Sequence, residues 1–128
     1  MISNKIKDGI LGNINIPSDK SISHRSIIIP SISMGVSEIN NLLMSDDVLH
    51  TLNAFKMLGV KIKKSNDKVI IYGNGLNSLK KPSKRIYLGN SGTSARLLTG
   101  LLASQPFETI LEGDHSLSSR PMSRIMDP

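Results

Sequence analysis

Three residues near the start of the chain, Lys20, Ser21 and Arg25, could together bind an anion. They follow a turn at which Ser18 or Asp19 can cap a helix that begins near Lys20, so free N–H groups and the positive end of the helix dipole are expected there. Arg25 lies four residues after Ser21, on the same helix face. These groups suit a phosphate or a carboxylate. The alternative is that Ser18 and Asp19 only cap the helix and that both basic residues are solvated.

The elements predicted around these residues follow a β-α-β-α-β-β order. Alternating hydrophobicity predicts strands, and apolar residues at helical spacing predict helices. The predicted elements are a strand at 14–16, a helix from 20, a strand at 36–39, a helix from 46 that stops at Gly59, and hairpin strands at 60–63 and 69–72. Pro30 falls inside the first helix and deletes a backbone hydrogen bond, so a kink or an end is expected there.

The same order of elements begins again near residue 85. The predictions are a strand at 86–88, a glycine-bearing turn at 89–93, a helix at 94–103, a strand at 109–111, and a helix that opens at Arg120 with Pro121 in its first turn. Lys20 and Asp46 are 26 residues apart, as are Gly92 and Ser118. This equal spacing indicates two copies of one unit, each with a basic, hydroxyl-rich turn before its first helix.

The predicted fold is therefore a mixed α/β (α+β) fold made of repeated β-α-β-α-β-β units. Residues 1–128 are expected to form one incomplete domain. Its first unit covers 12–75, and its second unit, 84–128, is cut short in its second helix. Half a unit leaves apolar faces uncovered, so the chain is expected to be truncated.

Composition favours small anionic partners. The net charge of +6 attracts anions, but two Phe, two Tyr and no Trp offer few stacking platforms for nucleic acid, which is disfavoured as a partner. The absence of Cys fits a cytoplasmic location, and no apolar run is long enough for a membrane span. The basic residues around the predicted hairpin are expected to form a solvated edge; they are Lys61, Lys63, Lys64 and Lys68. The three histidines, His24, His50 and His115, are expected to be surface or loop residues rather than metal ligands.

Several motifs in one order resemble the 5-enolpyruvylshikimate-3-phosphate synthase (3-phosphoshikimate 1-carboxyvinyltransferase) family. The resemblance runs from about Gly12 to Met126 and covers only the N-terminal portion of the family's chain. The motifs are Lys20-Ser21-Ile22-Ser23-His24-Arg25, Asn41-Leu42-Leu43, Ser45-Asp46-Asp47, Leu88-Gly89-Asn90-Ser91-Gly92-Thr93 with Arg96, and Ser119-Arg120-Pro121-Met122. This resemblance implies the enolpyruvyl transferase fold (an inside-out barrel), which has two lobes of three units each and binds the substrates between the lobes.

The resemblance also implies an activity and residue roles. The family moves the carboxyvinyl group of phosphoenolpyruvate to shikimate 3-phosphate and releases phosphate, in the shikimate pathway of aromatic amino acid and chorismate biosynthesis. It needs no cofactor and no metal. By resemblance, Lys20, Ser21 and Arg25 would bind shikimate 3-phosphate, Lys20, Gly92 and Arg120 would bind phosphoenolpyruvate, and Asp47, Asn90, Thr93 and Arg96 would support them. The acid/base residues belong to the second lobe, so no catalytic residue is expected here, and the chain alone is expected to be inactive.

Other interpretations stay open at this point. A related transferase that acts on UDP-N-acetylglucosamine would carry Lys-Asn in place of Lys20-Ser21, which disfavours it. A small basic β-α-β-α-β-β module can also serve as an RNA-associated or anion-binding protein. The chain could equally come from a decayed gene, or from a split enzyme with a separately encoded C-terminal part.

Overall fold

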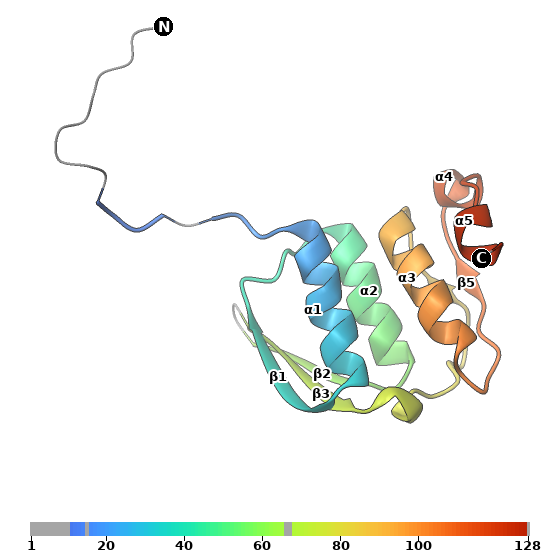
Figure 1. Ribbon diagram of the computed structural model, residues 1–128, viewed down its shortest axis with the longest axis horizontal. Helices are drawn as coiled ribbons and strands as arrows, with labels where there is room; N and C mark the ends of the chain where they lie inside the picture. The colour runs from blue at the N-terminus through green and yellow to red at the C-terminus, as the bar shows by residue number, and fades with distance from the viewer. Residues whose placement is uncertain (1–10, 15, 66–67, 128) are drawn as a thin grey trace, which may run out of the picture.

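The computed structural model describes residues 11–14, 16–65 and 68–127 and combines helices with two small sheets (Figure 1). The elements are α1 (Lys20–Ile32), β1 (Met34–Asn40), α2 (Asp46–Met57), β2 (Lys61–Ser65), β3 (Lys68–Asn74), the 3-10 turn η1 (Leu76–Ser78), β4 (Ile86–Tyr87), α3 (Gly92–Ala103), β5 (Leu111–Glu112), α4 (His115–Ser118) and α5 (Ser123–Met126). Their order confirms the predicted mixture of helix and strand. No closed barrel is formed by the described residues.

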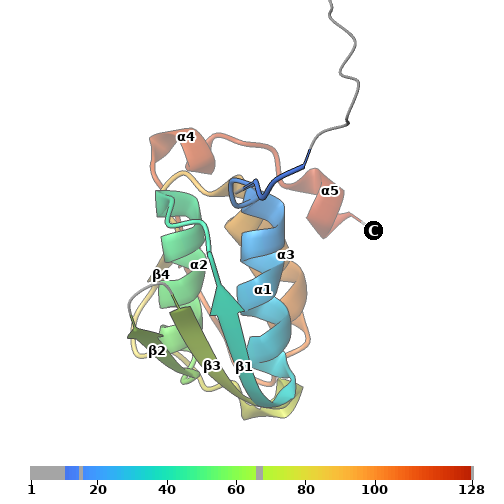
Figure 2. The same ribbon diagram turned by 90° about the vertical axis from the view of Figure 1, so that its left-hand side faces the viewer.

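The larger sheet has β3 at its centre, with β1 and β2 antiparallel on either side. Val69 and Ile71 of β3 are fully buried, whereas Tyr72 between Lys61 and Val36 lies on the other face. This alternation is the period-2 pattern of a sheet with one covered face. Figure 2 shows α1 and α2 behind the sheet and its other face open to the viewer.

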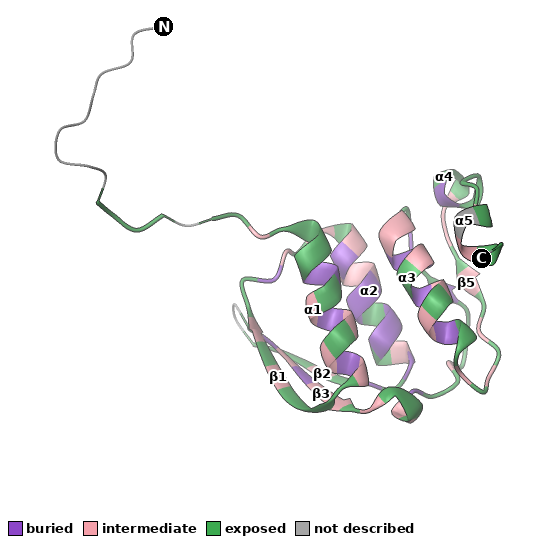
Figure 3. Cartoon of the chain, in the orientation of Figure 1, coloured by how far each residue is buried: buried purple, intermediate pink, exposed green. Residues whose placement is uncertain are grey.

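Helices α1, α2 and α3 run side by side and start at the same end of the molecule, the upper end in Figures 1 and 2. Their facing sides and the covered face of the sheet form one core, in which Ile27, Phe55, Leu58 and Leu98 are fully buried. Figure 3 shows buried residues where these helices face one another and exposed residues on the outer side of α1. The core therefore brings three helix N-termini together at one end of the molecule.

Neither of the two described residues of the strand predicted at 14–16 lies in a strand. Ile14 and Ile16 have no strand structure and are 84% and 72% exposed, while Asn15 lies outside the described residues. A strand needs a neighbour for its backbone N–H and C=O groups, and no strand of the described residues pairs with this segment. The prediction was wrong because alternation alone does not supply a partner.

Helix α1 continues through Pro30 to Ile32 and does not end at the proline. Pro30 lies in the last turn, where only one intrahelical hydrogen bond is lost, and its carbonyl accepts from the Ser33 N–H at 3.3 Å. Gly73 of β3 passes very close to this end. A Cβ at Gly73 would lie 2.1 Å from the Pro30 carbonyl oxygen and 2.3 Å from that of Ser33, so only glycine fits.

The second half of the chain contains α3, the parallel pair of β4 and β5, and two short helices. The helix predicted to open at Arg120 is replaced by α4 and α5, and Pro121 lies between them. A residue that precedes proline is disfavoured in helical conformation, so α4 ends before Arg120 and α5 begins only at Ser123. Among the described residues, no helix has both the length and the apolar character needed to cross a membrane.

Candidate anion-binding site

A polar cavity of about 310 Å³ lies at the common N-terminal end of α1, α2 and α3. Six residues from these helix starts and from the loop before α5 line it: Lys20, Asp47, Asn90, Gly92, Thr93 and Arg120. All six were predicted site residues. Helix N-termini carry partial positive charge and unpaired N–H groups, so three of them at one place favour a bound anion.

The N-terminus of α1 is capped by the residue that precedes it. Asp19 accepts a hydrogen bond from the Ile22 N–H at 2.7 Å, which confirms the predicted cap. Ser18 instead donates to the Asn41 carbonyl at 2.6 Å. The carboxylate of Asp19 offsets the dipole of α1, so the contribution of this helix to the cavity is mainly the side chain of Lys20.

Lys20 reaches across from α1 to Asp47 in the first turn of α2, and the two form an ion pair. The side chain of Lys20 is 51% exposed and that of Asp47 is 25% exposed. Asp47 therefore holds the ammonium at the cavity wall. With Arg120, the lining carries two cations and one carboxylate, and so a net positive charge.

The start of α3 lets another group come close to its backbone at Gly92. Ser91 caps the helix by accepting from the Ser94 N–H at 3.3 Å, and the Gly92 N–H donates to the Asn90 carbonyl at 3.0 Å. A Cβ at Gly92 would lie 2.7 Å from Nη1 of Arg120. The guanidinium therefore lies directly over Gly92, in the space that a side chain would fill.

Arg120 is held in this position by two contacts. Its Nη2 donates to the side-chain oxygen of Asn90. Arg96 in the first part of α3 donates to the Pro121 carbonyl at 2.9 Å and so ties the loop that carries Arg120 to the helix. Arg96 does not line the cavity, and its contribution is to position the neighbouring arginine.

The structure does not bring every predicted residue into the cavity. Ser21 and Arg25 lie on α1 with exposed side chains and are not part of the lining. They remain predicted ligands on the neighbouring surface of α1. No group of three or more His, Cys, Asp or Glu side chains that could hold a metal ion occurs in the part of the chain that the structure describes.

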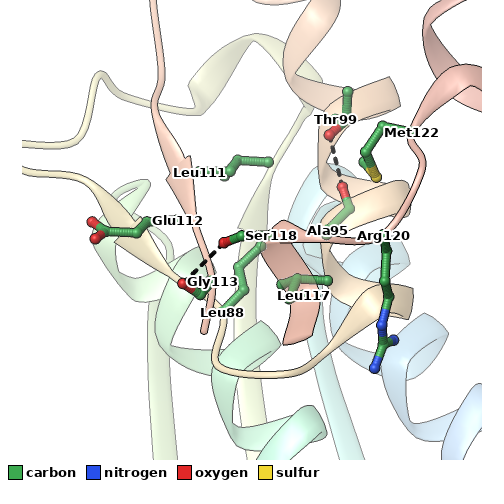
Figure 4. A pocket seen from close by; sticks show the side chains of 10 residues that line it. All are labelled: Leu88, Ala95, Thr99, Leu111, Glu112, Gly113, Leu117, Ser118, Arg120 and Met122. Atoms are coloured by element: carbon green, nitrogen blue, oxygen red, sulfur yellow. Dashed lines mark hydrogen bonds between the residues drawn. The ribbon is translucent and has the colours of Figure 1, made fainter. Parts of the chain in front are cut away.

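A second, apolar cavity of about 170 Å³ lies on the other side of Arg120, between α3, β5 and α4. Figure 4 shows Leu111, Leu117 and Met122 around it, with the guanidinium of Arg120 extending away from these side chains. The aliphatic part of Arg120 thus borders an apolar space while its charged end faces the polar cavity. This separation favours the extended conformation of the side chain.

His24 was predicted to be a surface or loop residue, and that prediction was wrong. It is fully buried in α1, and its Nδ1 is 2.8 Å from the Thr51 hydroxyl of α2. Burial lowers the pKa of His24 from its ordinary value of 6.5, while Asp47 raises it and Lys20 lowers it further. The neutral form is therefore favoured. His50 also lies in a helix, α2, and is half-buried, whereas His115 is exposed.

The hydroxyl of Thr51 continues this contact into α3. It lies 2.7 Å from the hydroxyl of Ser94, which in turn lies 2.5 Å from that of Ser91. All of these side chains are buried. Sequence reasoning did not identify this chain of hydrogen bonds. The one available signal was spacing, because His24 and Thr51 follow Lys20 and Asp47 by four residues each, one helical turn into the core.

Comparison with known proteins points to one family. The model of the family described as EPSP synthase (3-phosphoshikimate 1-carboxyvinyltransferase) matches residues 5–128. A 3-phosphoshikimate 1-carboxyvinyltransferase of Oenococcus oeni is 56% identical over 120 residues, 94% of this chain and 28% of that protein. One from Vesicomyosocius okutanii is 53% identical over 121 residues, again 94% and 28%.

A solved structure agrees with these sequences. EPSP synthase from Acinetobacter baumannii matches with a TM-score of 0.86 at 47% identity, over 91% of this chain and 27% of that chain. The fold described above is therefore the fold of the corresponding part of that enzyme. The chain spans about 28% of the length of the curated relatives that it matches.

Proposed function

The chain belongs to the family of EPSP synthase, 3-phosphoshikimate 1-carboxyvinyltransferase, and we propose that its polar cavity binds the anionic groups of that enzyme's substrates. In the proposed reaction, the carboxyvinyl group of phosphoenolpyruvate passes to the 5-hydroxyl of shikimate 3-phosphate and phosphate is released. This chain would supply one part of the substrate site of such a transferase, in the cytoplasm and in the service of aromatic amino acid biosynthesis.

One observation carries the proposal: Lys20 and Arg120 line the same cavity at the start of α3, where Gly92 has no side chain of its own. Both substrates carry a phosphate and a carboxylate. A planar guanidinium suits a carboxylate because it can donate two parallel hydrogen bonds, and an ammonium suits a phosphate as a compact charge. Donors fixed in advance by Asn90 and Asp47 need little rearrangement when charge develops on the reacting atoms.

The proposed role of each residue follows from its position. Phosphoenolpyruvate would lie over Gly92, between Lys20 and Arg120. Shikimate 3-phosphate would extend from Lys20 to the exposed side of α1, where Ser21 and Arg25 could reach its polar groups. The supporting residues would keep these donors in place, Asp47 by pairing with Lys20, Asn90 and Arg96 by holding Arg120 and its loop, and Thr93 by lining the cavity.

We further propose that residues 12–75 and 84–128 correspond to two repeated units of the family fold. In the described lining, the one carboxylate is Asp47, and it is already paired with Lys20. Proton transfer to and from the reacting atoms needs positioned acids and bases of suitable pKa. We therefore expect residues 1–128 to bind substrate without turning it over, and turnover to require further parts of the family's chain.

Isothermal titration of the 128-residue chain with phosphoenolpyruvate tests the proposal. We expect saturable binding that is weaker at high salt, because charge pairs are screened, and that exceeds the affinity for inorganic phosphate, because a carboxylate adds a second contact. Shikimate 3-phosphate should also bind saturably, and its affinity should fall once Arg25→Ala removes its proposed partner. Equal affinity for phosphoenolpyruvate and inorganic phosphate, or no saturable binding of either substrate, would overturn the assignment.

A further inference from the structure

We propose that the buried side chains of His24, Thr51, Ser94 and Ser91 are positioning residues that set the geometry of the anion-binding cavity. They form one continuous series of contacts across α1, α2 and α3, with separations of 2.8, 2.7 and 2.5 Å. This role is additional to the substrate contacts proposed above. The part of the test that uses phosphoenolpyruvate rests on the proposed function, whereas the part without ligand does not.

Each member of the series lies next to a residue that lines the cavity. His24 is one helical turn after Lys20 in α1, and Thr51 is one turn after Asp47 in α2. Ser91 lies between Asn90 and Gly92 in sequence, and Ser94 follows Thr93. The hydroxyls of Ser94 and Thr51 also lie 3.3 and 3.4 Å from the backbone carbonyl of Asp47. A shift of any one of the three helices along its axis would break a contact in the series.

Because these polar groups are buried, each needs a hydrogen-bond partner in a particular direction. His24, Thr51, Ser91 and Ser94 are all fully buried. A buried hydroxyl without a partner costs more than an apolar side chain of the same shape, so a placement of the helices that pairs the three hydroxyls with one another and with Nδ1 of His24 is favoured. Apolar contacts alone tolerate sliding because they are not directional. The series therefore fixes the relative placement of the helix starts that the apolar core leaves less well defined.

The same reasoning explains why the hydroxyls lie near the cavity rather than deeper in the core. Farther from their N-termini, α1 and α2 pack through large apolar side chains such as Ile27 and Phe55. At the upper end, the distance between Lys20 and Gly92 must match a small anion, and an error of about 1 Å is enough to weaken charge-assisted hydrogen bonds. Directional contacts meet this requirement.

The test removes one hydroxyl and keeps the shape of the side chain. Thr51→Val eliminates the central contact, and Thr51→Ser restores it. Thr99→Val is the matched control, because it removes a hydroxyl that bonds only within α3, to the Ala95 carbonyl at 2.8 Å. Ser94→Ala is a second variant, which breaks the same series at a helix position where alanine is well tolerated. The four variants and the wild type are prepared as the 128-residue chain.

Two measurements are made on each variant. The first measurement reports the geometry of the cavity without ligand. It compares the residual dipolar couplings of the N–H groups of Asp47, Gly92 and Thr93 with those of the C-terminal halves of α1, α2 and α3. Titration with phosphoenolpyruvate reports the function of the cavity. We expect Thr51→Val and Ser94→Ala to change these couplings and to weaken binding roughly tenfold, and Thr51→Ser and Thr99→Val to stay within about twofold of the wild type.

The outcomes separate the two hypotheses. If Thr51→Val and Ser94→Ala lower only the melting temperature, and the couplings and the affinity stay at wild-type values, the inference is wrong and the series is merely a buried stabilising contact. If the wild-type chain does not bind phosphoenolpyruvate, the proposed function fails. In that case the couplings alone still decide the inference, with changed values in both variants in its favour and unchanged values against it.

Discussion

Replacing Gly92 with alanine is the sharpest test of the cavity, because the structure shows what the new methyl group would meet. The added Cβ would lie 2.7 Å from Nη1 of Arg120, whereas ordinary van der Waals contact begins at 3.4 Å. The guanidinium must therefore retreat by about 0.7 Å. It is the far end of a flexible side chain, so it can move, but it then loses its alignment with the side-chain oxygen of Asn90.

The size of the effect follows from this contact. Hydrogen bonds to charged groups contribute about 1.5–3 kcal/mol, and partial loss near the lower end of that range corresponds to about a tenfold weaker affinity for phosphoenolpyruvate. Folding should be spared, because alanine is a better helix former than glycine by up to about 1 kcal/mol and no backbone atom is displaced. The variant should therefore bind less tightly and melt no lower than the wild type.

Gly100 in the same helix provides the control. Nothing lies within 4 Å of a Cβ built there, so Gly100→Ala should stabilise α3 and leave binding unchanged. Affinity is measured by isothermal titration and stability by thermal melting monitored by circular dichroism. The reasoning is refuted if Gly92→Ala binds phosphoenolpyruvate as tightly as the wild type, or if Gly100→Ala weakens binding to the same degree.

Three further predictions concern the charged residues of the cavity, the contact between β3 and α1, and the buried histidine. Lys20→Met and Arg120→Met should each weaken phosphoenolpyruvate binding about tenfold or more in low-salt titrations, whereas Lys63→Met, on the open face of the sheet, should have no effect; equal losses at all three positions would contradict the site. Gly73→Ala should destabilise the chain by about 3 kcal/mol or more in urea unfolding, because its Cβ would meet two backbone oxygens that cannot withdraw; a change below about 1 kcal/mol would show that β3 can move away from α1. Because burial lowers the pKa of His24 in the folded chain, the unfolded chain takes up a proton first as the pH falls below 6.5, and the free energy of unfolding should fall by at most about 1.4 kcal/mol per pH unit. His24→Gln should remove this part of the pH dependence, and an identical slope in wild type and variant between pH 7 and pH 5 would count against it.

Local rules predicted those elements whose signals lie close together in the sequence. The cap at Asp19, the acidic first turn of α2 and the alternation in the hairpin strands all act over a few residues, and all appear in the structure. The strand at 14–16 and the helix at Arg120 failed for a different reason. A strand depends on a distant partner, and the effect of Pro121 on the residue before it outweighed the preference of proline for a first helical turn.

The candidate site was more predictable than the contacts beneath it. Helix starts collect N–H groups and positive potential, so the residues at the start of α1 could be assigned to an anion site from sequence. Asp47, Asn90, Gly92 and Arg120 were assigned to the same site only through the family resemblance. His24 carried no such signal. Its surroundings come from Thr51 and, through it, Ser94, on two other helices, and only the packing of all three shows that the histidine is buried and hydrogen-bonded.

Two cations line the cavity, and each has an acceptor within the chain. Lys20 is paired with the carboxylate of Asp47, and Arg120 donates to the side-chain oxygen of Asn90, so both positive groups have an internal acceptor in the place where a ligand oxygen could compete. The pair of Lys20 and Asp47 is partly exposed, and such pairs contribute about 0–1 kcal/mol. A charge-assisted hydrogen bond to a desolvated phosphate or carboxylate is worth about 1.5–3 kcal/mol. The pairing with Asp47 is therefore weak enough for Lys20 to exchange it for a substrate oxygen.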